Sequence, residues 1–283
     1  MPLPGESTQN VKRLLELFPI GVLREVWNLK GSKEEVCQAV AEEHAADAII
    51  NFVDTHLSCC KQHVHVFARG ENAARLPATV QGRHPVKAGA FSALFILHAE
   101  YTVVLKDPYE DATLDFLWPV RVETTADHVV ARFVVLEKNL GSYFERPYLL
   151  NSRSADEKDV VAELATALGM APADLHAGVK KLWVENYMDS SRARYKRPKS
   201  MAFEAMDEER GIKEHDPELY ERLLDSVLFA STFVINHEHE RAKDLTVSVV
   251  SVDPSTGYIA FPRYADRVGD TERVIREILT NNQ

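Results

Sequence analysis

The sequence predicts an α+β protein, with a helical bundle over residues 1–62 followed by an antiparallel-sheet body over residues 63–283. Three observations support this prediction. In the first sixty residues, apolar side chains recur at helical spacing, as in Val11, Leu14 and Leu15. In the middle of the chain they alternate with period two, which is typical of strands. In the last third, both patterns occur.

Short helices account for the first sixty residues. Ser7 or Thr8 can cap the first helix through its side-chain oxygen, and Pro19 cannot continue that helix. Ser32 and Glu35 have the spacing of a capping box, in which each side chain satisfies the backbone N–H of the other. Several short helices in so few residues indicate a compact bundle, which is more typical of an interaction module than of an enzyme.

The middle of the chain indicates antiparallel strands. Residues 63–67 alternate, residues 69–90 have a loop composition rich in glycine and proline, and residues 91–105 form a long apolar stretch. Residues 117–136 alternate on both sides of the dipeptide Ala126-Asp127, which predicts a hairpin.

The last third mixes helices and strands. A helix is expected up to Gly169, and Asp270 is expected to cap a closing helix. Residues 189–218 are polar and charge-segregated, and the apolar stretch 220–233 is predicted to be helical. A second hairpin is expected between residues 245–252 and 258–261. Its first strand could add to a partner's sheet at an open edge, or could be an ordinary covered strand.

Composition limits the class of function. The chain has 283 residues, of which 45% are apolar and 27% charged, as in ordinary globular proteins. A net charge of −10 excludes a generally basic coat for nucleic acid, although it leaves room for a local basic patch. Three cysteines cannot form a disulfide framework, and neither a bilayer-spanning stretch nor a secretory signal pattern occurs. We therefore expect a soluble protein of the nucleus or cytoplasm that makes no membrane contact.

Sequence motifs for catalysis are absent. There is no glycine-rich phosphate loop, GxSxG elbow or CxxC pair. His237 and His239 lack the HExxH spacing of zinc ligands, and the acidic residues at 107–115 lack a partnering lysine motif. We therefore expect no cofactor, no metal and no small-molecule substrate. An enzyme with an unrecognised site, built around a histidine such as His98 or His128, remains an alternative.

A local cluster of cations lies at residues 192–199. Each cation could neutralise a phosphate, and Tyr195 could stack on a base or sugar. A solvated linker that attracts the acidic stretch 204–218, or an import signal, would explain the same composition. The cations are Arg192, Arg194, Lys196, Arg197 and Lys199.

Scattered segments between residues 8 and 190 resemble the centromere protein N family of kinetochore subunits. Residues 11–19 resemble the family's opening helix, because a basic pair is followed by an apolar run and a proline. Further similarity lies at residues 22–27, 64–67, 121–132 and 174–187. The order of these segments agrees with the helical bundle and sheet body predicted above.

The resemblance implies a pyrin-like (death-fold) N-terminal domain and a place at the centromere of the nucleus. The implied partners are nucleosomal DNA and histones, together with a related subunit of the centromere protein L type. Lys12 and Arg13 match the first-helix position that reaches DNA in the family, and Arg153 stands near a second basic position. Residues 171–176 depart from the family because they carry no arginine.

We therefore predict a non-enzymatic protein that binds the centromeric nucleosome through contacts to DNA phosphates, which hold a protein in place without reading sequence. An adaptor whose helical bundle binds another helical domain, without nucleic acid, is the main alternative. The predicted DNA-binding residues are Lys12, Arg13, Arg153, Arg192, Arg194, Lys196, Arg197 and Lys199.

Overall fold

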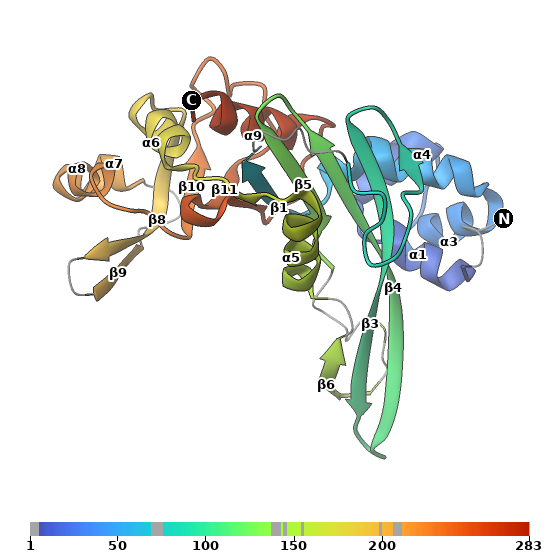
Figure 1. The fold of residues 1–283 in the computed structure, drawn as a ribbon. Coiled ribbons are helices and arrows are strands. Elements are labelled where there is room, and N and C mark those ends of the chain that lie inside the picture. The colour runs from blue at the N-terminus through green and yellow to red at the C-terminus, as the bar shows by residue number, and fades with distance from the viewer. Residues whose placement is uncertain are drawn as a thin grey trace. The chain divides into compact units, whose positions relative to one another are not determined.

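The computed structural model describes residues 6–68, 76–136, 143, 146–153, 156–197, 200–205 and 211–282 (Figure 1). The chain divides into two compact units. Unit 1 comprises Met1–Leu57, Arg75–Glu123 and Phe133–Gly169, and unit 2 comprises Ser58–Ala74, Thr124–Arg132 and Met170–Gln283. Unit 1 therefore joins the N-terminal helices to strands from the predicted body.

The N-terminal helices form as the sequence predicts. They are α1 (Thr8–Leu15), α2 (Ile20–Trp27), α3 (Lys33–Glu43) and α4 (Ala46–His56). The Ser7 side chain accepts a hydrogen bond from the Asn10 N–H, and Ser32 and Glu35 form the predicted capping box. The apolar side chains Val11, Leu14 and Leu15 of α1 are fully buried. Phe18, in the turn after α1, packs on Phe52 of α4, and their ring centroids are 4.9 Å apart.

A long antiparallel hairpin follows in unit 1. Strand β3 (Ser92–Leu105) pairs with β4 (Glu110–Thr124) along its whole length, and β6 (Tyr148–Arg153) pairs with the distal half of β3. The short strand β2 (Lys87–Ala88) pairs with the start of β3, and α5 (Glu157–Leu168) ends at Gly169 as expected.

The predicted hairpin around Ala126-Asp127 is confirmed. A turn joins β4 to its neighbour β5 (His128–Val134), and in this turn the Thr125 N–H donates to the His128 carbonyl at 2.8 Å. Within unit 1, the Trp118 Nε1 donates to the Val134 carbonyl at 2.8 Å. The sequence indicated this short hairpin because both of its strands alternate. The first part of β3 is apolar on both faces, so its pairing with β4 could not be recognised from alternation.

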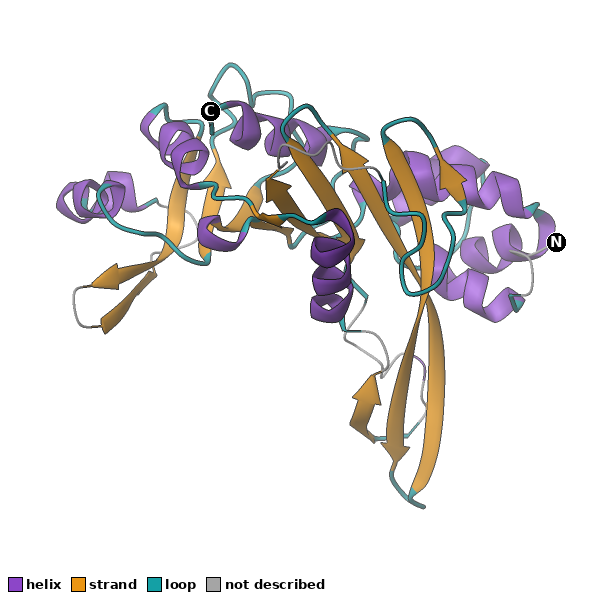
Figure 2. Ribbon diagram, in the orientation of Figure 1, coloured by secondary structure: helices purple, strands orange, loops and turns teal. Residues whose placement is uncertain are grey.

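Unit 2 is built on strands in the order β5-β1-β12-β11-β10-β8-β9, and the short β7 pairs with the end of β1. Figure 2 shows the mixture of strands and helices that makes the protein an α+β fold. The bounds are β1 (Gln62–Ala68), β7 (Ala171–Pro172), β8 (Met188–Arg197), β9 (Ser200–Ala205), β10 (Ser231–Ile235), β11 (Val249–Asp253) and β12 (Tyr258–Phe261).

Helices cover one side of this sheet. The core between them contains Trp183 and Tyr187 beside strand residues such as Phe233. Gly178 of α6 lies so close to α9 that a Cβ atom there would be 2.1 Å from the Ile278 carbonyl oxygen. The helices are α6 (His176–Val184), α7 (Ile212–His215), α8 (Pro217–Leu224) and α9 (Asp270–Thr280). In the described part of the chain, no helix is long and apolar enough to cross a membrane.

Three expectations for the last third were wrong. Residues 189–218 are not a linker, because β8 and β9 form a hairpin there. Residues 220–233 are helical only as far as Leu224, and β10 follows. Of the two alternatives left open for residues 245–252, the covered strand is confirmed, because β11 has neighbours on both sides. Gly269 rather than Asp270 is the N-cap residue of α9.

Candidate nucleic-acid interface

Strand β8 displays a row of cations. Arg192, Arg194 and Lys196 are exposed, whereas the residues between them, Ala193 and Tyr195, are 0% and 4% exposed. Because successive side chains of a strand point to opposite faces, the three cations lie on one face and the two buried residues on the other.

Backbone pairing on one side of β8 brings apolar residues to the same face. The Phe229 N–H donates to the Arg194 carbonyl at 2.7 Å, and the Lys196 N–H donates to the Val227 carbonyl at 3.1 Å. This pattern sets Phe229 opposite Arg194 and Val227 opposite Lys196. Val227 is 47% exposed and Phe229 is half-buried. We call this surface the cation face and define it as Arg192, Arg194, Lys196, Val227 and Phe229.

The aromatic residue of this face is not the one that the sequence suggested. Tyr195 cannot stack on a bound nucleic acid, because it is only 4% exposed and belongs to the hydrophobic core. It pairs with Leu228 on the core side. Phe229 takes the exposed position instead. Sequence analysis missed it because the apolar composition of residues 220–233 indicated a helix.

The cation face keeps its positive charge. Among the residues that the structure describes, no carboxylate pairs with Arg194 or Lys196. The nearby carboxylate of Asp189 accepts hydrogen bonds from Trp183 Nε1 at 2.7 Å and from the Lys213 N–H at 3.3 Å. Two cations are therefore available to an anionic ligand.

Lys12 and Arg13 of α1 are half-buried and engaged by other residues of unit 1. The Lys12 side chain is 12% exposed, and its Nζ lies 2.8 Å from Glu34 Oε1. The Arg13 Nη1 donates to the Asp115 carbonyl at 3.1 Å, and the guanidinium lies 5.6 Å from the Tyr143 ring centroid. A phosphate would have to displace these contacts within unit 1 before binding the pair.

The remaining predicted DNA-binding residues are described only in part. Arg153 lies in β6 opposite Tyr101, and Arg197 lies in β8 opposite Ser200, but the side chains of both arginines are outside the description. Lys199 lies outside the described residues altogether.

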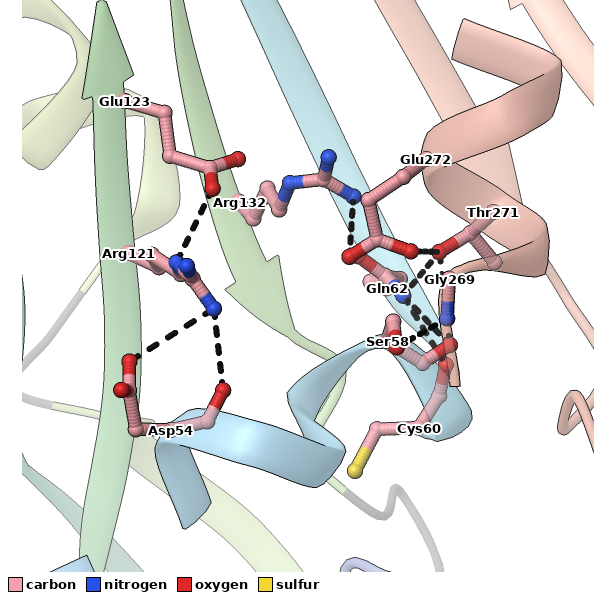
Figure 3. Close-up of polar contacts among 10 residues, drawn as sticks. All are labelled: Asp54, Ser58, Cys60, Gln62, Arg121, Glu123, Arg132, Gly269, Thr271 and Glu272. Atoms are coloured by element: carbon pink, nitrogen blue, oxygen red, sulfur yellow. Dashed lines mark hydrogen bonds and ion pairs between the residues drawn. The ribbon is translucent and has the colours of Figure 1, made fainter. Parts of the chain in front are cut away.

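Two arginines elsewhere, the half-buried Arg121 and the buried Arg132, lie close to carboxylates within their own units (Figure 3). In unit 1, the Arg121 Nη1 donates to the Asp54 carbonyl at 2.9 Å, and its Nε lies 3.0 Å from Glu123 Oε1. In unit 2, Arg132 is 4% exposed and lies 3.4 Å from Glu272 Oε1. Pairing of this kind is what allows a charged group to be buried, and it accounts for both clusters without a ligand.

A second cluster in unit 2 ties β1 to the start of α9. Gln62 is fully buried, and its Nε2 donates to Thr271 Oγ1 at 3.2 Å and to the Ser58 carbonyl at 3.0 Å (Figure 3). The Gly269 N–H donates to Ser58 Oγ at 3.1 Å. These bonds satisfy polar groups at a helix terminus, which is a structural role.

The histidines considered as catalytic or metal-binding groups lie on different elements: His98 in β3, His128 in β5 and His237 after β10. His98 of unit 1 lies 2.7 Å from Glu6 Oε1. In unit 2, burial lowers the pKa of His128, and Asp127 only partly opposes that effect. His237 is exposed in the turn after β10. No group of three or more metal-ligating side chains occurs among the described residues.

No family model, curated protein or solved structure matches this chain.

Proposed function

We propose that this protein is a non-enzymatic subunit of the centromere protein N type, which binds nucleosomal DNA through the cation face. The single observation that carries this proposal is the row formed by Arg192, Arg194 and Lys196, exposed on one side of β8. Basic and aromatic residues on one surface provide both charge neutralisation and stacking contacts.

The spacing of the row fits a phosphate backbone. Residues i and i+2 of a strand lie about 6.8 Å apart. Phosphates of one DNA strand advance about 3.4 Å per nucleotide along the helix axis, and they also wind around it, so neighbouring phosphates lie farther apart than this rise. A row of cations at this strand spacing can contact successive phosphates of one strand without any demand on base sequence.

Other parts of the proposal assign roles to the rest of the chain. The helices α1 to α4 would be a pyrin-like (death-fold) bundle that contacts histones, and a related subunit of the centromere protein L type would bind elsewhere on the molecule. The order of helices before an antiparallel sheet supports this assignment. The proposal places the protein in the nucleus, at the centromere and kinetochore of the chromosome.

Charge reversal tests the proposal. We expect the double variant Arg194→Glu and Lys196→Glu to weaken binding both to mononucleosomes and to naked DNA of the same length. Because Lys12 and Arg13 are engaged within unit 1, Lys12→Glu with Arg13→Glu should have the smaller effect on DNA affinity, provided that thermal melting shows the fold to be intact. If neither variant changes binding, the phosphate role is lost and the adaptor alternative gains.

A further inference from the structure

The sheet of unit 2 has a second polar surface on the side away from its core. In β1, Val64 and Val66 belong to the core, so the half-buried His63 and His65 lie on the other side. Tyr258 of β12 lies opposite His65. Its ring centroid is 5.4 Å from that of His63 and 5.2 Å from that of His65, so three rings group at this end of the sheet.

Strand register extends this surface to the cation face. Figure 1 labels β1, β11, β10 and β8 within unit 2, and the strand order is β1-β12-β11-β10-β8. Successive cross-strand partners of His63 are Ala260, Ser251, Thr232 and finally Arg192. With about 4.8 Å between neighbouring strands, this row spans about 19 Å.

The middle of the row is small and polar. Thr232 Oγ1 and Ser251 Oγ are hydrogen-bonded at 3.1 Å, and Ala260 adds only a methyl group. No long side chain stands between the ring cluster and Arg192 along this row. We call this surface the sheet track and define it as His63, Tyr258, Ser251, Thr232 and Arg192.

We propose that the sheet track binds a single strand of nucleic acid. Unpaired bases expose their faces and stack on aromatic or imidazole rings, whereas a duplex hides those faces. The rings of His63 and Tyr258 would hold bases at one end, and Arg192 would hold a phosphate at the other. The ligand is expected to be a polyanion, because the sheet track ends at Arg192 and so adjoins the positive charges of the cation face.

One carboxylate lies beside the track. Asp253 faces the same side as its cross-strand partner Tyr258, and its Oδ1 accepts a hydrogen bond from Ser255 Oγ at 2.7 Å. It is displaced along the strand from the row that joins His63 to Arg192, so the small-residue path itself carries no negative charge. The proposal deepens the proposed function and rests on it for Arg192, which belongs to both surfaces.

The test compares a labelled oligothymidine of 20 nucleotides with a labelled 20-base-pair duplex, using fluorescence anisotropy and the full chain. We expect Tyr258→Thr combined with His63→Thr to weaken oligothymidine binding about tenfold or more, because each stacked base contributes about 1–3 kcal/mol. Duplex affinity should change less than twofold. Threonine should be tolerated at positions 63 and 258 without loss of the fold, because Thr232 and Ser251 already occupy the same face of this sheet.

A second variant keeps the rings. Ser251→Glu places a carboxylate in the small-residue path, and we expect it to weaken oligothymidine binding while leaving duplex binding nearly unchanged. Tyr258→Phe is the matched control that should keep full affinity for the single strand.

The outcomes separate the two proposals. Unchanged oligothymidine affinity in both Ser251→Glu and the threonine double variant would overturn the sheet track, whatever the duplex does. Equal losses for duplex and single strand would also overturn it, because stacking would then not distinguish them. Loss of duplex binding in Arg194→Glu with Lys196→Glu tests only the proposed function, since neither residue belongs to the track.

Discussion

Removing Arg194 and Lys196 together should lower the salt dependence of DNA binding by a definable amount. Each phosphate contact contributes about −0.9 to the slope of log affinity against log salt concentration. The three cations of the row therefore contribute about −2.7, and Arg194→Ala with Lys196→Ala leaves about −0.9. Between 50 and 200 mM salt, these contributions correspond to affinity losses of roughly 40-fold and 3.5-fold.

Contacts from residues outside the description would add equally to both slopes, so the expected difference of about 1.8 does not depend on them. The assay is equilibrium binding to a short duplex at four salt concentrations. The matched control is Lys181→Ala with Arg222→Ala, which removes the same charge from exposed positions on helices α6 and α8. Equal slopes in the two double variants would refute the reasoning, because net charge rather than local contact would then control binding.

Three further predictions concern stability and reactivity. Gly178→Ala should lower the free energy of unfolding by about 1–3 kcal/mol in urea titration, because a Cβ would meet the α9 backbone at 2.1 Å. Gly21→Ala, with nothing within 4 Å, should instead stabilise the protein by up to about 1 kcal/mol. Burial raises the pKa of the Cys37 thiol to about 12, so we expect a disulfide reagent at pH 8 to react with it only after unfolding. Burial acts to raise the pKa of Asp174, but hydrogen bonds from His176 lower it overall. Its stabilising effect should therefore be present above the ordinary carboxyl pKa and be lost as the pH falls through the lowered value, and Asp174→Asn should remove this acid dependence from the urea midpoint.

Local signals explain the elements that the sequence predicted correctly. The capping box at Ser32 and Glu35 satisfies backbone groups within one turn, so it needs no distant partner. The sequence alternates on both sides of Ala126-Asp127, which indicated strands, although β5 is buried on both faces. Gly169 ends α5 in the left-handed region at a φ of 63°, a conformation that glycine adopts without steric cost.

Distant pairing explains the elements that were missed. Residues 189–205 contain few apolar side chains, so composition favoured a linker. The buried positions of β8 are nevertheless covered, because Tyr195 lies against Leu228 in the core. Leu228 in turn belongs to a segment whose apolar composition favoured a helix. Neither segment is recognisable as a strand without the other, since the partner supplies the hydrogen bonds and the burial.

The candidate site was predictable in charge but not in geometry. The spacing of Arg192, Arg194 and Lys196 is period two, which in a strand places all three on one face. The composition of residues 192–199 gave no reason to expect a strand. The sequence analysis therefore predicted stacking by Tyr195, which is the aromatic residue nearest to these cations in sequence. The structure shows that a strand which exposes its cations must bury Tyr195, and Phe229 takes the exposed place from across the ladder.

The net charge of −10 does not by itself oppose binding at this face. Electrostatic interactions in water are screened over about 10 Å at 0.1 M salt, so a phosphate held by Arg194 is largely shielded from more distant acids. At 0.01 M salt the screening length rises to about 30 Å, and the anionic remainder of the protein would then repel the same DNA. This repulsion would reduce the gain in affinity at low salt, so the salt slope has to be measured at moderate salt.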